Sequence, residues 1–381
     1  METRKLYYED CHLREFDAQV LTCSQTDKGF AVTLSATAFY PEGGGQACDL
    51  GTLGQAQVLD VQEQGTEILH YCSIPLEVGS TVRGVIDWQR RFDLMQQHSG
   101  EHIVSGLVCS TLGYHNVGFH VGSDRMEIDF DGPITAQQLQ DIERRANEAV
   151  WQNIPIACFW PSPEALPQVY YRTKKALPWP VRIVKIGDVD SCACCGVHVK
   201  STGEIGLIKL ISCVKFHQGV RIELVCGGRA YDYLRRVYEE ARLVSQTLSV
   251  PVEAVGEGTR KLADALAAEK FHASGLLNRL FAHIAEGYAG QTNVVHFEEG
   301  LDSAQVRALA DKMVAVTEGY CAVFSGTDGN YCYCLASRQQ DLRQMNKALT
   351  ATLNGRGGGK PDFQQGSVKA TREEILAFFR P

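Results

Sequence analysis

The chain has 381 residues, of which 44% are hydrophobic and 22% are charged, a composition typical of a folded globular protein and not of a disordered one. The net charge is −8, so contact with nucleic acid would have to come from a local basic patch. No run of about 18 apolar residues predicts a membrane span, and the N-terminus lacks the apolar core of a secretory signal. We therefore expect a cytoplasmic protein, whose 14 cysteines serve as thiols or metal ligands and not as disulfides.

The first 88 residues show the alternation of β-strands, which predicts a small β-barrel-like domain over residues 1–88. A Gly-rich segment interrupts it, Phe39-Tyr40-Pro41-Glu42-Gly43-Gly44-Gly45-Gln46. The expected strands cover residues 19–24, 30–35, 56–61, 67–72 and 82–88.

Residues 89–229 mix helices and strands in an order that fits an α+β domain. Apolar spacing predicts a helix over 90–112, ended by Gly113. A second helix is expected over 135–151, where Thr135 and Gln138 have the spacing of a capping box. Strands are expected at 125–130, 204–213 and 219–226.

The remaining chain is expected to form two further parts. Residues 230–288 have helical periodicity broken at Pro251, and an antiparallel helical hairpin, which could dimerise, is the simplest arrangement. Residues 289–381 alternate short strands and helices and predict a mixed α/β domain. The chain as a whole is therefore placed in the α+β class.

Two pairs of side chains have the spacing of metal ligands. His98 and His102 lie four residues apart on the first predicted helix, so their imidazoles can converge on one ion. Cys194 and His198 have the same offset further along. Each pair alone has a common alternative, a solvated helix face or a buried strand end. Together they supply four nitrogen and sulfur ligands, which predicts a Zn²⁺ site.

This pattern resembles the metal motif of the alanyl-tRNA synthetase editing domain and of the free-standing alanyl-tRNA editing proteins. Matching stretches follow in the same order over nearly the whole chain. They are the Gly-rich segment with Asp49-x-Gly51, then Val85-Ile86-Asp87-Trp88-x-Arg90-Arg91, the strand pair at 204–206 and 219–223, and Asn354-Gly355-Arg356-Gly357-Gly358-Gly359-Lys360-Pro361-Asp362. The last resembles the Gly-rich signature of the synthetase's C-terminal domain, which also occurs in DHH-associated domains.

The resemblance implies a trans-editing deacylase that hydrolyses mischarged Ser-tRNA(Ala) or Gly-tRNA(Ala) with zinc. No segment is left for an aminoacylation domain, and no Asp-His-His motif occurs, so we expect neither tRNA charging nor phosphodiesterase activity. An apolar pocket that selects alanine for attachment to tRNA cannot strongly reject serine, which differs by one hydroxyl. A second site that hydrolyses the wrong product therefore makes physical sense. The alternatives are a non-catalytic tRNA-binding protein that retains the fold and a deacylase of another mischarged tRNA.

The chain departs from the family pattern at two places. The family usually has Gly-Gly-Thr between the cysteine and the histidine, whereas this chain has Cys195-Gly196-Val197. Cys192 and Cys195 compete with Cys194 as the sulfur ligand, and spacing alone does not settle the choice. After the first helix the chain has His115-Asn116-Val117-Gly118-Phe119-His120 in place of the usual Gln-containing stretch, so the polarity of that pocket wall does not follow from the family.

Gln46, Ser99 and Glu101 are the candidate catalytic or substrate-pocket residues. Glu101 does not share the direction of the two histidines on the helix, so a solvated carboxylate is the commoner interpretation and a general base is the alternative. Ser99 could bond substrate or lie on the helix surface. Gln46 could reach the pocket or pack between strands.

The C-terminal end carries the predicted tRNA-binding surface. Residues 337–381 have eight basic and four acidic side chains, a net charge of +4 against −12 for the rest. Arg356 and Lys360 flank Gly357-Gly358-Gly359, whose bare backbone can approach phosphates closely. A solvated loop is the alternative. A smaller basic cluster, Arg172 with Lys174 and Lys175, could guide the acceptor end of the tRNA.

Overall fold

A computed structural model describes residues 2–173, 177 and 179–380. The fold is mixed α and β, as expected for the α+β class, and forms two compact units over residues 1–243 and 244–381. The boundary between the two units falls inside the predicted helical part 230–288, and the boundaries of the four predicted domains stay predictions. No described helix has the length and apolar character needed to cross a membrane.

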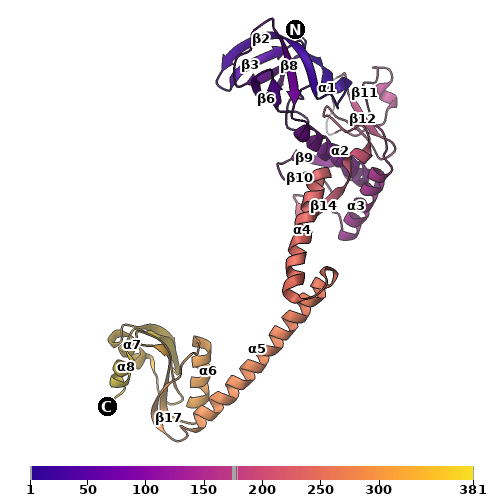
Figure 1. Cartoon of the computed structure of the whole chain (residues 1–381). Coiled ribbons are helices and arrows are strands. Elements are labelled where there is room, and N and C mark those ends of the chain that lie inside the picture. Colours follow the sequence, from indigo (N-terminus) through magenta and orange to yellow (C-terminus); the bar gives the residue numbers. More distant parts are fainter. Residues whose placement is uncertain (1, 174–176, 178, 381) are drawn as a thin grey trace. The chain divides into compact units, whose positions relative to one another are not determined.

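Six strands of the first unit close into a barrel in the order β2-β3-β7-β6-β5-β8 (Figure 1). The alternation along the sequence reflects this closure, because Phe16, Ala18 and Val20 of β2 face the barrel core while their neighbours are exposed. The barrel strands are β2 (Glu15–Thr26), β3 (Gly29–Leu34), β5 (Gly51–Leu53), β6 (Ala56–Gln64), β7 (Glu67–Cys72) and β8 (Thr81–Ile86). The short β1 (Arg4–Lys5) pairs with β4 (Ala36–Thr37), and α1 (Leu6–Glu9) follows β1.

Helix α2 (Trp88–Leu112) carries both predicted histidine ligands. It begins at Trp88 because the Asp87 side chain caps it, accepting a hydrogen bond from the Arg90 amide at 3.1 Å. It ends at Gly113, whose φ of 72° is left-handed, as the sequence predicts. All of residues 97–108 are buried, so this stretch of the helix is covered on every side and its polar side chains lie inside the unit.

Helix α2 and helix α3 (Ala136–Trp151) pack against a four-stranded sheet of order β14-β15-β10-β9. The Thr135 and Gln138 capping box of α3 is present. Strand β14 begins at Ile208 and not at Glu204, because Thr202–Ile205 forms a short 3-10 helix. The strands are β9 (Asn116–Val121), β10 (Met126–Phe130), β14 (Ile208–Phe216) and β15 (Gly219–Cys226).

A three-stranded sheet brings the cysteine-rich segment against α2. Its order is β11 (Ile156–Phe159), β12 (Ile183–Ile186) and β13 (Asp190–Ala193), and β13 contacts α2. Gly106 of α2 permits this approach, since a Cβ there would lie 2.4 Å from the Val189 carbonyl oxygen. Strand β13 ends directly before Cys194.

The helices expected between residues 230 and 288 are α4 (Gly227–Leu248) and α5 (Val255–Glu286), with Pro251 and the 3-10 helix Val252–Ala254 between them. The apolar stripe of α4 is largely exposed in the first unit, Leu234 at 40% and Val237 at 48%. The hairpin packing and a homodimer stay predictions.

The second unit contains a five-stranded sheet of order β16-β17-β18-β20-β19. Helix α6 packs on one face, and α7 and α8 contribute to a separate apolar cluster. The elements are β16 (Thr292–Phe297), α6 (Ser303–Val314), β17 (Glu318–Thr327), β18 (Asn330–Ser337), α7 (Arg343–Thr352), β19 (Arg356–Lys360), β20 (Phe363–Val368) and α8 (Arg372–Phe378).

The Gly-rich segment of the second unit is not a loop. It forms β19, the edge strand, which pairs antiparallel with β20 so that Gly357 faces Gly366. A Cβ at Gly357 would lie 2.3 Å from the Tyr333 hydroxyl, and one at Gly359 would lie 2.2 Å from the Phe363 carbonyl oxygen. The glycines therefore allow close packing within the sheet.

Candidate metal centre

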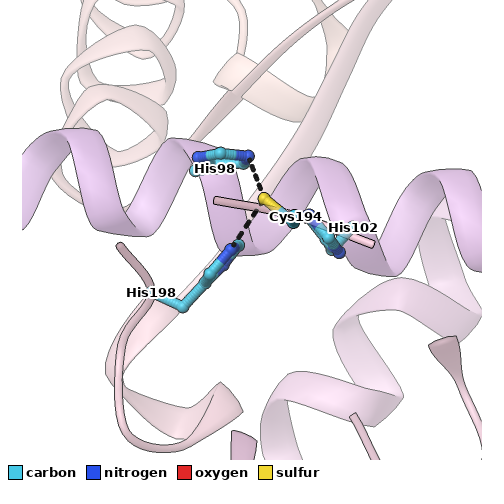
Figure 2. A group of neighbouring side chains, drawn as sticks. All are labelled: His98, His102, Cys194 and His198. Atoms are coloured by element: carbon cyan, nitrogen blue, oxygen red, sulfur yellow. Dashed lines mark hydrogen bonds between the residues drawn. The ribbon is translucent and has the colours of Figure 1, made fainter. Parts of the chain in front are cut away.

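Four side chains of the first unit converge on one point (Figure 2). His98 and His102 come from α2, and Cys194 and His198 come from the segment after β13. Their ligand atoms all lie within 4.8 Å of one another. The Cys194 Sγ is 3.4 Å from His98 Nε2 and 3.5 Å from His198 Nε2. The structure thus brings together the four residues that the two sequence pairs predict.

Each imidazole of the centre is held at Nδ1 by a neighbouring polar side chain, which leaves Nε2 to face the other ligands. The three pairs are His98 with Gln46 Oε1 at 2.8 Å, His102 with Asp190 Oδ2 at 2.9 Å, and His198 with Ser99 Oγ at 3.2 Å. Oxygen acceptors at Nδ1 favour the tautomer with a bare Nε2, which is the form that binds metal ions. The centre is therefore organised for ligation.

Gln46 and Ser99 form hydrogen bonds with two of the histidine ligands and do not face the cavity beside the centre. Both side chains are buried and neither lines that cavity. Glu101 differs from them, because it lines the cavity and is only 5% exposed. The interpretation of Glu101 as a solvated helix-face carboxylate is wrong: the sheet covers α2 on the side that a free helix would expose. The catalytic or substrate role of all three residues stays a prediction.

The charges at the centre favour the metal-binding forms of Cys194 and His198. Burial would raise the pKa of the Cys194 thiol, but His98 and His102 hold that pKa well below its ordinary value of 9.0, which favours the thiolate. Burial and the neighbouring His98 lower the pKa of His198 to about 3, so its imidazole is neutral. His102 differs, because burial would lower the pKa of its imidazole but the Cys194 thiolate and Asp190 raise that pKa well above the ordinary value of 6.5, so a metal ion would displace a proton there on binding.

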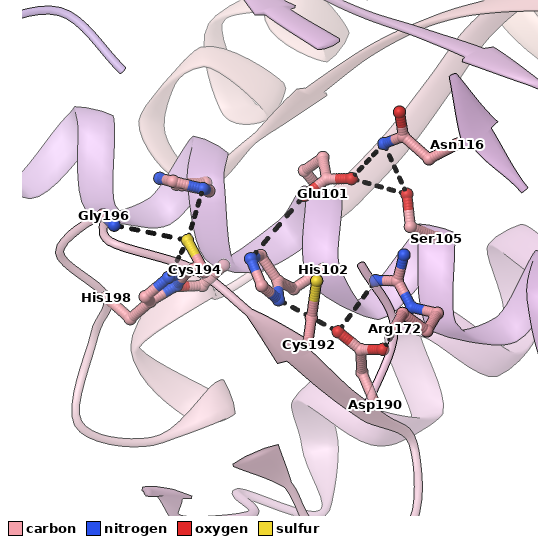
Figure 3. Close-up of polar contacts among 12 residues, drawn as sticks. Glu101, His102, Ser105, Asn116, Arg172, Asp190, Cys192, Cys194, Gly196 and His198 are labelled. Carbon is pink, nitrogen blue, oxygen red and sulfur yellow. Dashed lines mark hydrogen bonds and ion pairs between the residues drawn. The ribbon is translucent and has the colours of Figure 1, made fainter. Parts of the chain in front are cut away.

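An ion pair that the sequence did not predict supports His102 from outside the centre (Figure 3). Arg172 donates to Asp190 from Nε at 2.7 Å and from Nη2 at 2.9 Å. Burial would raise the pKa of the Asp190 carboxyl, but His102 and Arg172 together lower it. Asp190 and Cys192 alternate along β13, and Cys194, directly after the strand, continues this spacing of two residues, which was the available signal in the sequence.

Arg172 is bonded to Asp190, and a part for it in guiding the acceptor end of a tRNA stays a prediction. Its side chain is only 14% exposed. The other two members of that predicted basic cluster, Lys174 and Lys175, lie outside the described residues.

The geometry separates the three competing thiols. Cys194 belongs to the four-residue centre. Cys192 instead forms a second group of potential ligands with His102 and Asp190. Burial raises the pKa of Cys192 to about 11, so it remains a protonated thiol. Cys195 is exposed and belongs to neither group of potential ligands among the described residues.

A cavity of about 790 Å³ opens beside the centre, a size that suits a small organic group. His98, His102 and Cys194 form part of its wall. The rest of the wall comes from the first Gly-rich segment, α2, β9 and the chain before β12 and includes Gly44, Gly45, Glu101, Asn116, Phe119, Tyr170 and Arg182. Three of the four potential metal ligands thus border a space that a substrate can enter.

Two family models match the first unit. Residues 2–90 match the model described as tRNA synthetases class II (A). Residues 181–238, which contain Cys194 and His198, match the model described as Threonyl and Alanyl tRNA synthetase second additional domain.

Known proteins match over almost the whole chain. The alanyl-tRNA editing protein Aarsd1 of Mus musculus is 30% identical over 391 residues, covering 96% of this chain and 94% of that protein. The alanine–tRNA ligase of Pyrococcus abyssi is 32% identical over 397 residues, covering 97% of this chain but 42% of the ligase. The crystal structure of the C-Ala domain of Aquifex aeolicus alanyl-tRNA synthetase aligns with 24% of this chain at 20% identity, with a TM-score of 0.21 that carries no argument about the fold.

Proposed function

We propose that this chain, which belongs to the family of alanyl-tRNA editing proteins, is a zinc-dependent deacylase of mischarged Ser-tRNA(Ala). Its relatives support alanyl-tRNA editing at the level of the family. The observation that carries the proposal is the four-ligand centre of His98, His102, Cys194 and His198 at the wall of the cavity. The reaction is hydrolysis of the ester between an amino acid and the terminal ribose of the tRNA.

Three imidazole nitrogens and one thiolate are the donor set that supports zinc as the metal. A zinc ion held there would polarise the ester carbonyl or lower the pKa of a water molecule. The chain itself holds the ligand segment in place: Arg182 donates from Nη1 to the carbonyl oxygens of Cys194 at 2.9 Å and of Gly196 at 2.8 Å. This guanidinium fixes the turn on which Cys194 approaches the helix.

The polar wall of the cavity supports a preference for serine over alanine. Glu101 and Asn116 line the cavity, and the Oδ1 of Asn116 is buried with no hydrogen-bond partner among the described residues. A seryl hydroxyl can satisfy a polar group that the methyl group of alanine leaves unpaired. The same argument protects correctly charged Ala-tRNA(Ala) from hydrolysis.

We expect Ser-tRNA(Ala) to be hydrolysed roughly 10- to 100-fold faster than Ala-tRNA(Ala), the discrimination that one unpaired buried polar group provides. Deacylation time courses with Ser-, Gly- and Ala-charged tRNA(Ala), together with metal analysis of the same preparation, measure this ratio. Equal rates on the seryl and alanyl esters would contradict an editing role, since such an enzyme would discharge the correct product.

We also propose that the second unit binds the tRNA through β19. Arg356 and Lys360 stand at the two ends of this strand, and all five of its residues are exposed. Because β19 is an edge strand, the backbone N–H groups on its free side have no strand partner. Two basic side chains, together with the N–H groups that every second residue of an edge strand turns away from its partner strand, are suited to phosphates.

Replacing Arg356 and Lys360 together with alanine is expected to weaken tRNA binding without slowing the chemical step. The log–log salt dependence should become shallower by roughly two units if both side chains contact phosphates. The KM for tRNA should rise while turnover at saturation is unchanged. The matched control is Arg343→Ala, since Arg343 is already bonded to Asp341. A salt slope identical to that of the parent protein would mean that β19 does not contact the tRNA.

A further inference from the structure

Glu101 is a buried carboxylate with one oxygen held by two hydrogen bonds and the other in contact only with His102, at ion-pair distance (Figure 3). Its Oε1 accepts hydrogen bonds from Ser105 Oγ at 2.5 Å and from Asn116 Nδ2 at 2.6 Å. The Asn116 Nδ2 also lies 3.1 Å from Ser105 Oγ, so the three side chains form one network. The Glu101 Oε2 accepts no hydrogen bond from any part of the chain that the structure describes.

The charge of Glu101 has no close cationic partner of its own. Within 4.0 Å, its only ion-pair partner in the described structure is His102, whose Nε2 lies 3.9 Å from Oε2 and faces the metal ligands. Arg172 lines the same cavity, but its Nε and Nη2 are bonded to Asp190. A buried charge without a partner is costly, so a cation brought by a ligand would stabilise this carboxylate.

The substrate of the proposed function carries such a cation. In an aminoacyl ester the α-carbon bears the ammonium group and is bonded directly to the carbonyl carbon, so an anchored ammonium positions the bond to be cleaved. A zinc ion with one thiolate and three neutral imidazoles keeps a net positive charge, which repels an ammonium.

We propose that Oε2 of Glu101 accepts a hydrogen bond from the α-ammonium of the aminoacyl group, while Ser105 and Asn116 hold the carboxylate in place. This assignment rests on the proposed function and specifies which substrate group the cavity recognises. It differs from a general-base role, because a base acts on water whatever the acyl group, whereas an anchor acts only on a substrate that has the ammonium.

The test compares Ser-tRNA(Ala) with its deaminated counterpart, in which nitrous acid has replaced the ammonium by a hydroxyl group. Each rate is divided by the spontaneous hydrolysis of the same ester. The parent protein should prefer the ammonium ester by about 10- to 100-fold in kcat/KM, the effect of one charge-assisted hydrogen bond. Glu101→Gln should reduce that preference to less than about threefold, chiefly by slowing hydrolysis of the ammonium ester.

The control is Glu148→Gln, which removes an exposed carboxylate on α3 and should keep the full preference. Equal slowing of both esters by Glu101→Gln would overturn the assignment, as would a parent protein without preference. A parent protein that hydrolyses neither ester would remove the proposed function as well, so the two failures are distinguishable.

A binding measurement supplies a readout without turnover. Seryl and glyceroyl groups joined by an amide to 3′-amino-3′-deoxyadenosine are stable probes. They differ only at the α-carbon, which bears an ammonium in the first and a hydroxyl in the second. Calorimetry should give tighter binding of the seryl probe to the parent protein. Ser105→Ala should reduce the difference in affinity between the two probes, because the Glu101 carboxylate is then held less firmly. Equal binding of the two probes by the parent protein would overturn the assignment even if every variant misfolded.

Discussion

Replacing Cys194 with serine is expected to remove most of the bound metal from the purified protein, which we expect to carry about one zinc ion. The serine hydroxyl is too weakly acidic to supply the anionic ligand that the thiolate provides. The three histidines would remain, but they would lack the sulfur that lies 3.4 Å from His98 Nε2 and 3.5 Å from His198 Nε2. Metal analysis after gel filtration, with zinc-to-protein ratios for parent and variant, measures the loss.

The matched control is Cys195→Ser. Its thiol is exposed and lies outside the four-residue centre, so the variant should keep nearly all of its metal. If Cys195→Ser empties the site while Cys194→Ser retains the ion, the ligand assignment is wrong.

Replacing Asp49 with alanine is expected to destabilise the first unit by roughly 3–5 kcal/mol, the cost of leaving a buried charge without its partner. Asp49 and Arg91 are both fully buried, and Arg91 Nε lies 2.8 and 2.9 Å from the two carboxylate oxygens. Asp49 also accepts a hydrogen bond from the Tyr40 amide at 2.5 Å, and Arg91 Nη2 donates to the Ala38 carbonyl at 2.5 Å. Removal of the carboxylate therefore breaks the contact between the Gly-rich segment and α2.

Denaturant unfolding of the zinc-loaded protein measures this loss. The control is Arg83→Ala, which breaks an ion pair with Glu15 whose side chains are 65% and 49% exposed and should cost at most about 1 kcal/mol. A loss of stability in Asp49→Ala no larger than in Arg83→Ala would contradict a structural role for the buried pair.

The spacing of residues along the sequence was enough to predict the part of the metal centre that lies on helix α2. The spacing of His98 and His102 places both imidazoles on one face of a helix, and the boundary at Gly113 follows from a conformation that favours glycine. The approach of β13 to this helix is a tertiary contact. The one sign of this contact in the sequence was Gly106, because a glycine inside a helix can mark a point where another backbone comes close.

The roles of Gln46, Ser99 and Glu101 could not be assigned from the sequence. Ser99 and Glu101 stand on either side of a glycine in α2, yet one holds a ligand and the other faces the cavity. Which of them meets His198 depends on where the strands cover the helix. For the same reason the sequence did not predict that β19 is a strand: glycine has a low strand propensity, but pairing with β20 overrides it.

The measurement that most directly tests hydrolysis at the metal centre is the deacylation of Ser-tRNA(Ala) before and after removal of the metal. Protein stripped with a chelator should lose its activity and recover it when one equivalent of zinc is restored. The Cys194→Ser variant should not recover under the same conditions. Full activity in the stripped protein, or no activity in the zinc-loaded protein, would contradict an ester hydrolase built on His98, His102, Cys194 and His198.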